Sequence, residues 1–291
     1  MASAAAVAPP PAIRSPRPRH RIVNVQVTIG LVILAGLAAA AIILPFFVPL
    51  RMLTLETPLQ SPSWSHPMGL GENSQDIFSE WIYAARYSLT VGLAAGLGST
   101  ALSIAIGASA GYVGGWADDA LSFLIRVVLL VPPIPALYVV GFALGIEGLG
   151  GLILLLSLMT WAYGADLIRS QVVALRQQGF VLAATAAGES PLQVMVREVL
   201  PHLRGLVLFV LVNAALFALQ SEFALEFLGW DALANANSLG GGWGMMLTSR
   251  YFNIDFFGGA WWVWTFPGLG IMVTTAALAL ISAGLAGRER A

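Results

Sequence analysis

The chain has 291 residues, of which 58% are hydrophobic and only 10% are charged, and its mean hydropathy is +0.81. Soluble domains usually carry about 25% charged residues, so this composition excludes an ordinary cytosolic enzyme or a disordered chain and indicates a polytopic membrane protein. The net charge of −1 excludes a general affinity for nucleic acid, and the absence of cysteine excludes disulfides and thiolate chemistry.

The N-terminal segment differs in composition from the rest of the chain. Residues 1–21 are rich in alanine and proline and carry four arginines, a composition that cannot bury a core and predicts a disordered cytoplasmic tail. The next segment, residues 22–50, is an apolar run much longer than the core of about 7–15 residues in a cleaved signal peptide. We therefore expect it to be a retained first transmembrane anchor.

Gaps between charged residues locate the membrane spans, because charge is costly in hydrocarbon. About 20 apolar residues cross a bilayer as a helix. The uncharged stretch Ala232–Ser249 is rich in Asn, Ser and Gly and predicts a loop instead. The sequence therefore predicts an all-α protein with six transmembrane helices, within the segments Ile22–Leu50, Tyr87–Ala117, Val127–Ile146, Gly148–Ala165, Gly205–Ser221 and Phe256–Gly287.

Residues 51–86, between the first two spans, form a long segment that we expect on the extracytoplasmic side. Its last part reads DIFSEWIYAAR, which places Ile77, Trp81 and Ala84 on one helical face and predicts an amphipathic helix lying at the membrane interface. Residues 87–287 then form a core of five helices that contains a long cytoplasmic loop, residues 169–204.

Arginines are distributed unevenly over the two predicted sides of the membrane. Ten lie in the segments assigned to the inside and three in those assigned to the outside, with Arg126 near the inner end of the third span. Because positive charge is retained on the cytoplasmic side, both termini are predicted to be cytoplasmic.

The long inner loop contains a second structural pattern. Val181–Ala187 favours a helix, which Gly188 breaks. Ser190 is placed as an N-cap with Gln193 three residues later, and a second helix is expected from Pro191 to about Val199, ended by Leu200-Pro201. The residues alone leave two interpretations of this hairpin open, a docking site for another protein and a connector between spans.

In its spacing the hairpin resembles the EAA loop of the permease subunits of ABC importers, where the ATPase subunits dock. Ala183-Ala184, Gly188 and Leu200-Pro201 follow the register of that loop, whereas Leu182 and Glu198 replace its Glu and its Ile. The resemblance implies a coupling loop with these candidate residues: Ala183, Ala184, Ala187, Gly188, Glu189, Ser190, Leu200 and Pro201.

Other stretches are similar to the dipeptide, oligopeptide and nickel permeases of that family. Parts of SWSHPMGLGENSQDIFSEWIYAARYSLTVG match, although the Thr-Asp after Gly69 and the Gly-Arg before Asp76 are missing. Further landmarks follow in order, namely GYVGGWADDAL, EFALEFLGW, GWGMML and FPGLGIMV.

The resemblance implies a subunit with the fold of type I ABC importer permeases in the bacterial inner membrane. It would move di- or oligopeptides, or a related solute such as nickel, by alternating access. The implied partners are a second permease in a heterodimer, two ATPases that bind ATP and Mg²⁺, and an extracytoplasmic binding protein, besides membrane lipid and without nucleic acid. The chain itself contains no lysine, so it cannot form a Walker phosphate-binding motif, and no cofactor is expected in it.

Prolines and a carboxylate within the spans mark a candidate translocation path, formed by Pro132, Pro133, Pro135 and Glu222. Prolines break a helix where protein or a water-filled cavity supplies hydrogen-bond partners, and close packing against neighbouring helices explains them equally well. Intramembrane carboxylates also occur in ion-coupled transporters, so a self-contained secondary transporter is the alternative function. The sequence shows neither the internal repeat that such a transporter needs nor the assembled catalytic residues of a membrane enzyme.

Overall fold

Long uncharged segments form the helices that dominate this structure. The computed structural model describes residues 20–49, 57–72, 74–230, 241–248 and 259–289. Within these ranges the regular structure is helical, apart from one isolated bridge between Leu70 and Asp76. The predicted all-α class is confirmed. The predicted tail falls almost entirely on residues 1–19, outside the described residues, as does most of the predicted loop at 232–249.

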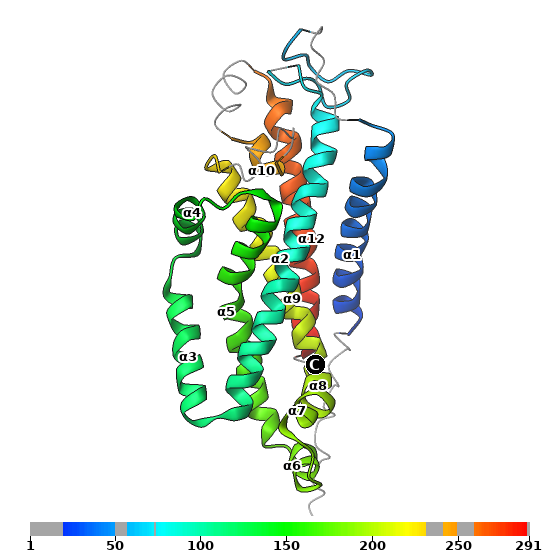
Figure 1. Cartoon of the computed structure of the whole chain (residues 1–291). Coiled ribbons are helices and arrows are strands. Elements are labelled where there is room, and N and C mark those ends of the chain that lie inside the picture. Colours follow the sequence, from blue (N-terminus) through cyan, green and yellow to red (C-terminus); the bar gives the residue numbers. More distant parts are fainter. Residues whose placement is uncertain (1–19, 50–56, 73, 231–240, 249–258, 290–291) are drawn as a thin grey trace, which may run out of the picture.

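Short connections join the described helices from α2 to α9, whereas longer segments precede α2 and lie on both sides of α10 (Figure 1). Their bounds are α1 His20–Ile43, η1 Leu44–Phe46, α2 Ile77–Val113, α3 Gly115–Leu130, α4 Pro133–Ala143, α5 Gly148–Arg176, α6 Gly179–Ala186, α7 Pro191–Val194, η2 Met195–Val199, α8 Leu200–His202, α9 Arg204–Phe227, α10 Trp243–Met246 and α12 Trp261–Glu289.

Five of these helices are long and apolar enough to cross a membrane, and the bent pair α3 and α4 makes a sixth span if it is counted as one. The two helices of this pair meet at 92°. Val131 and Pro132 between them are extended, because proline has no N–H to donate and disfavours a helical conformation in the residue before it. The third predicted span is thus broken at its prolines.

One expected element is not separate. The predicted interfacial helix forms the first turns of α2, which begins after the N-cap Asp76 and continues without interruption to Val113. The Asp76 carboxylate accepts a hydrogen bond from the Ser79 N–H at 3.4 Å. Ile77, Ile82 and Ala84 are buried against the rest of the protein, so packing rather than a lipid surface takes up this apolar face.

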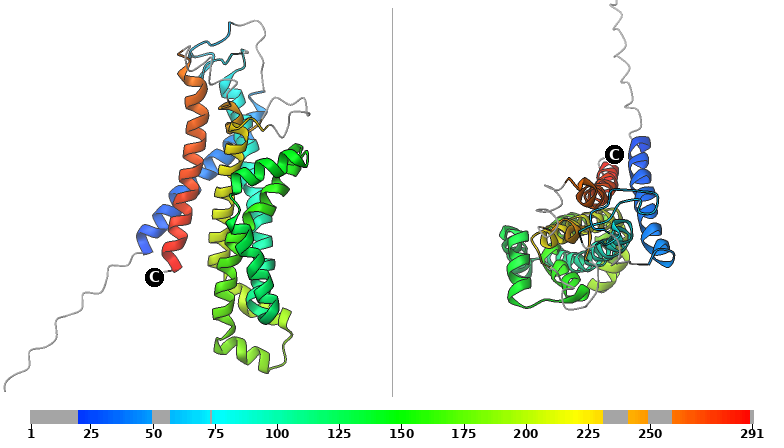
Figure 2. Two further views of the ribbon diagram at one scale, coloured as in Figure 1. Left: turned by 90° about the vertical axis from the view of Figure 1, so that its left-hand side faces the viewer. Right: turned by 90° about the horizontal axis from the view of Figure 1, so that it is seen from above.

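Helix α2 lies at the centre of the bundle, packed against α5 and α9 (Figure 1). Small residues allow this close approach: a Cβ at Gly107 would overlap the backbone of Ala165 on α5, and one at Gly96 would press on Ala215 of α9. Helix α1 crosses α12 at the edge of the bundle (Figure 2), where Gly30 leaves room for the Ala277 backbone.

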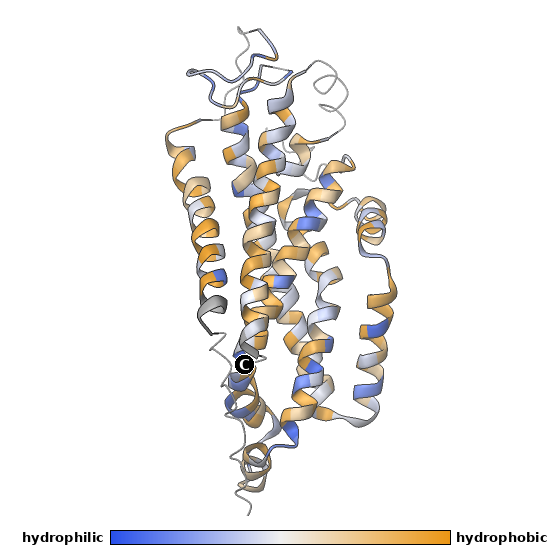
Figure 3. Cartoon of the chain, turned by 180° about the vertical axis from the view of Figure 1, so that it is seen from behind, coloured by the Kyte–Doolittle hydropathy of each residue, from blue (hydrophilic) through white to orange (hydrophobic). Residues whose placement is uncertain are grey.

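The two ends of the bundle carry different parts of the chain. The start of α1, the end of α12 and the helices α6 to α8 lie at one end, and α4 and α10 lie toward the other (Figure 1). Apolar residues cover most of the length of the long helices, whereas hydrophilic residues gather near the ends (Figure 3). We call the end that carries α6 to α8 the hairpin end, and the end toward which α4 and α10 lie the outer end.

Candidate functional site

The hairpin formed by α6, α7, η2 and α8 projects from the ends of α5 and α9 (Figure 1). Its apolar side is buried in a cluster with Ile168 and Val172 of α5 and with Leu206 and Val210 of α9. The hairpin contributes Val181, Val194, Val199 and Leu203 to this cluster. Phe180 also stacks on His202, with ring centroids 4.5 Å apart, and so joins α6 to α8. The hairpin is therefore an ordered, packed element.

The turn of the hairpin has the hydrogen bonds that the sequence predicts. Gly188 has φ +88°, a left-handed conformation that glycine adopts without cost, and the N–H groups of Gly188 and Glu189 donate to Thr185 O and Ala184 O. Ser190 and Gln193 form the predicted capping box, because Gln193 N–H donates to Ser190 Oγ at 3.4 Å and Ser190 N–H to Gln193 Oε1 at 2.9 Å.

The second arm is longer than predicted. Leu200-Pro201 does not end it, and the helix continues to His202 through a π-helical turn, η2, in which Leu200 N–H donates to Met195 O. A proline ring clashes with the carbonyl four residues earlier in a regular helix, and a widened turn ahead of Pro201 accommodates it. Leu200 and Pro201 consequently lie beside α9, apart from the other six coupling-loop candidates at the turn.

The outward side of the hairpin is apolar although it is exposed. Leu182, Leu192 and Val196 are 59%, 73% and 53% exposed. Gly188 has open space where a Cβ would be. Exposed aliphatic side chains next to a turn glycine, which has no side chain, permit the close approach of another protein. We call Leu182, Gly188, Leu192 and Val196 the hairpin surface.

Two arginines fix the hairpin end to the rest of the bundle. Arg169 of α5 donates through Nε and Nη2 to the two carboxylate oxygens of Asp118 on α3, at 2.5 and 2.8 Å, and Ser122 Oγ donates to the same carboxylate. Arg176 Nη1 donates to Tyr112 O at 3.0 Å. No local pattern in the sequence indicates these pairs, because their partners are 51 and 64 positions apart.

A cavity of about 590 Å³ lies among α2, α3, α4, α5 and α9. Most of its lining is aliphatic, and no Asp, Glu or Arg is among the described residues that line it. Its polar groups are neutral, namely Ser99, Ser103, Thr160, Tyr163, Asn213 and Gln220. The Ser99 hydroxyl is buried and meets no hydrogen-bond partner in the described chain. The cavity can thus take a neutral or amphipathic group and offer it hydrogen bonds.

The structure divides the candidate path residues. Pro133, at the start of α4, lines the cavity, whereas Pro132 and Pro135 are not among its lining residues. Glu222 is also not there. It is fully buried on another side of α9, where Ser88 of α2 donates a hydrogen bond to it at 3.0 Å. Glu222 is thus held between α9, α2 and the α10 region, and its place in a translocation path stays a prediction.

Few of the residues that line the cavity were predicted from the sequence. Helices α2, α5 and α9 were predicted as spans. The faces that they turn toward the cavity depend on how these helices cross one another, which the sequence pattern does not give. One signal was available, since Asn213 and Gln220 are polar interruptions, two helical turns apart, in an otherwise apolar span.

Together, the fold and these sites define a polytopic helical membrane protein with a structured hairpin between its fourth and fifth spans. Residues 103–288 match the family of the binding-protein-dependent transport system inner membrane component. The chain belongs to this family, and it is a multi-pass permease component of an inner-membrane transport system.

Named relatives cover almost the whole chain. The dipeptide transport system permease protein DppC of Bacillus subtilis (strain 168) is 30% identical over 258 residues, which is 88% of this chain and 78% of that protein. A protein of the same name from Alkalihalophilus pseudofirmus is 29% identical, over 90% of this chain and 84% of its own length. A putative peptide permease protein of Brucella ovis is 27% identical, over 88% and 83%.

Proposed function

We propose that this chain moves di- or oligopeptides through the inner membrane by alternating access, driven by ATPase subunits that dock on the hairpin surface. The observation that carries the proposal is the exposed aliphatic surface around Gly188, on a hairpin that is itself packed against α5 and α9. A push on such a hairpin is transmitted to two spans at once. The names of the relatives support peptides as cargo.

ATP and Mg²⁺ belong to the partner ATPases in this proposal. The chain has no lysine, and a Walker motif needs one. The other partners proposed are a second permease subunit, forming a heterodimer, and an extracytoplasmic binding protein that delivers the cargo. With the hairpin on the ATPase side, the start of α1 and the end of α12 are cytoplasmic, because they lie at the same end (Figure 1).

Substitution at the turn tests the docking site. Gly188→Arg adds bulk and charge to the hairpin surface, and we expect the protein to stay in the membrane while co-purification of the ATPase is lost. Gly145→Arg is a matched control, since Gly145 also has φ above zero, at +57°, and open space around it, but lies at the opposite end. Normal recovery of the ATPase with Gly188→Arg, or equal loss with both variants, contradicts docking at the hairpin.

The cavity is the part of the path that we assign to this chain. The bend at Val131 and Pro132 leaves the cavity between the broken span and α9. The neutral polar groups of the cavity suit peptide amides, which need hydrogen bonds without a fixed charge. The uncharged lining also argues against the alternative, an ion-coupled secondary transporter, which binds its ion at charged or carbonyl-rich sites within the membrane.

Cysteine labelling tests this assignment, because the natural chain has no cysteine. Gln220→Cys places a thiol in the cavity, and Leu208→Cys places one on an exposed part of α9 outside it. In the assembled importer we expect a water-soluble maleimide to react at position 220, more slowly when peptide and ATP are supplied, and to react at position 208 slowly under all conditions. Labelling at position 220 that cargo and ATP leave unchanged contradicts the assignment.

A further inference from the structure

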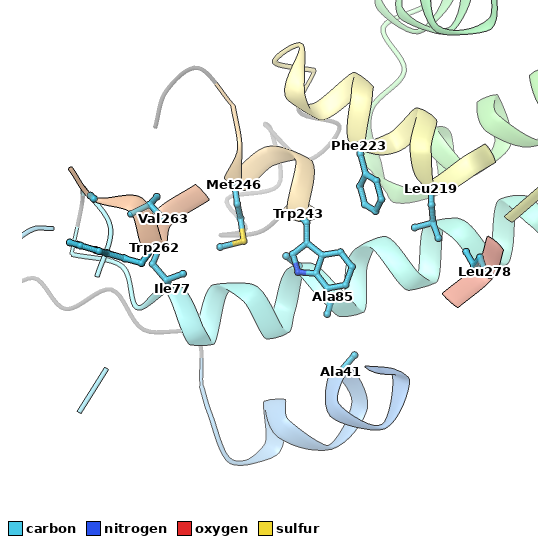
Figure 4. Packing of buried hydrophobic residues seen from close by; sticks show 12 residues of the cluster. Ala41, Ile77, Ala85, Leu219, Phe223, Trp243, Met246, Trp262, Val263 and Leu278 are labelled. Carbon is cyan, nitrogen blue, oxygen red and sulfur yellow. The ribbon is translucent and has the colours of Figure 1, made fainter. Parts of the chain in front are cut away.

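Two buried glutamates of α9 hold a short helix at the outer end. Glu222 and Glu226 are one turn apart and 0% and 3% exposed. Glu226 is hydrogen-bonded to the backbone of α10, and Glu222 is linked to α10 through Ser88 of α2. Trp243 of α10 packs among Phe223, Met246 and Ala85 (Figure 4). Trp243 also donates from its ring Nε1 to Trp81 O of α2 at 3.2 Å. The short helix α10 is thus fixed to α9 and α2.

Glu226 binds the backbone at the start of α10. Its Oε1 accepts from Gly242 N–H at 2.7 Å, and its Oε2 accepts from Met245 N–H at 3.0 Å. Both carboxylate oxygens therefore act as acceptors from α10. Hydrogen bonds of this kind favour the ionised carboxylate.

Glu222 has a different environment. Its Oε1 accepts from Ser88 Oγ, which in turn accepts from Trp243 N–H at 3.4 Å. Its Oε2 is buried and meets no hydrogen-bond donor among the described residues. Within the described chain, the two groups that act on the Glu222 carboxyl are Ser88 and Glu226. An ionised Glu222 would leave this oxygen without a donor beside a second negative charge.

The two carboxyl groups converge at Gly242. A Cβ at this position would overlap Glu222 Oε1 and Ser88 Oγ, and it would press on Glu226 Oε2. Two ionised carboxylates repel each other at such short range in a buried site, and both of their oxygen pairs can only accept. A single proton removes the repulsion and supplies the missing donor.

We propose that Glu222 and Glu226 form a proton-binding pair, with Glu222 neutral and Glu226 ionised, and that this proton keeps α10 docked on α9. Loss of the proton places two charges against each other beneath α10 and weakens its attachment. The pair is then a proton-dependent latch at the outer end. The proposal does not depend on the cargo or on the ATPase.

Among the residues that the structure describes, the elements next to Glu222 supply no positive charge that acts on it. From α2 the neutral Ser88 faces it, and α10 and α12 up to residue 287 contain no titratable side chain. Among the described residues no charged group other than Glu226 acts on Glu222. Helices α2, α4 and α5 carry other titratable side chains, none of which is among the groups that act on Glu222. Apart from Tyr112 and Arg176, at the far ends of α2 and α5, these are Glu80, Tyr83, Arg86, Tyr87, Tyr138, Tyr163, Asp166 and Arg169.

A thiol next to α10 measures whether it is docked. Thr248 lies two residues after the end of α10 and is 5% exposed, so Thr248→Cys introduces a small, buried thiol into the full-length chain in membranes. Its rate of reaction with a membrane-impermeant maleimide is measured at each pH from about 5 to about 9. It is divided by the rate for Ser65→Cys, at an exposed position within residues 57–72. The division removes the ordinary effect of pH on thiol reactivity.

The expected rate ratio is low at the acidic end and rises about tenfold toward the alkaline end, as the proton leaves. With Glu222→Gln, a neutral group of the same shape, the ratio stays low throughout. With Glu226→Gln, which loses one of its two acceptors for α10, it is high throughout. Two results overturn the proposal: a rate ratio that does not change with pH when both glutamates are present, or a rise with Glu222→Gln equal to the rise without it. This comparison needs only Glu222→Gln, so it stands even if Glu226→Gln fails to fold.

Discussion

At the hairpin end, the turn between α6 and α7 is held by hydrogen bonds between close neighbours in the chain, and aliphatic side chains remain exposed on its surface. At the outer end, hydrogen bonds join residues far apart: Trp81 Nε1 donates to Phe266 O across 185 positions, and Trp262 Nε1 donates to Leu70 O across 192. The hairpin turn is therefore a local unit that presents an exposed surface, on a hairpin that is itself packed against α5 and α9. At the outer end, these bonds join α2, α12 and the segment 57–72 to one another.

The difference in contacts predicts different consequences of mutation. A change at the outer end perturbs several helices together, because several hydrogen bonds there join distant segments. A change in the hairpin turn affects mainly the hairpin and whatever binds it. Three substitutions of decreasing severity test this contrast.

Gly242→Ala is expected to have the largest effect on stability. Its Cβ overlaps Glu222 Oε1 and Ser88 Oγ, so α10 must leave its place, and we expect the free energy of unfolding in detergent to fall by about 3 kcal/mol. Gly268→Ala in α12 is the control, because nothing lies within 4 Å of the added Cβ. Equal stability of the two variants would show that α10 is not packed as described.

Arg169→Ala is expected to have the next largest effect. It removes the bidentate partner of Asp118, and we expect a loss of about 2 kcal/mol in the free energy of unfolding. Asp118→Ala and the double variant complete a thermodynamic cycle. Effects that simply add, with no coupling between the two positions, would contradict a direct bond between α3 and α5.

Ser190→Ala is expected to have the smallest effect. It removes one bond of the capping box, at a cost of about 1 kcal/mol confined to the hairpin. Hydrogen exchange should become faster at the Gln193 amide and stay unchanged in α2. Faster exchange along α2 as well would show that the hairpin turn is not an independent local unit.

Much of the fold follows from local features of the sequence. Charge gaps located five spans but missed the start of the third, which begins at Gly115 because α3 includes the charged Asp118, Asp119 and Arg126. The prolines at 132 and 133 marked the break, and Gly188, Ser190 and Gln193 defined the turn. These features succeed because each acts within a few residues. The exceptions are also local in origin: the helix start at Asp76 looked like a separate interfacial element, and Pro201 looked like a helix end until a π-helical turn accommodated it.

The sites were less accessible from the sequence, because they depend on which helix faces which. Glu222 was expected near a path, and the structure places it against Ser88, 134 positions earlier in the chain. The cavity contains Gln220, only two residues before it, on another side of the same helix. Helical spacing gives the relative directions of these two side chains, but the packing of α2, α5 and α10 decides what each one meets.

Site-directed cross-linking compares the two ends most directly. Leu192 on the hairpin surface and Leu144 at the end of α4 are 73% and 70% exposed, so Leu192→Cys and Leu144→Cys place equally accessible thiols at opposite ends of a chain without natural cysteine. A short thiol-reactive cross-linker is added to the assembled importer in membranes, and the cross-linked products are identified. We expect the ATPase to be linked to position 192 and not to position 144. An ATPase linked to position 144, or to neither position, would contradict docking at the hairpin end.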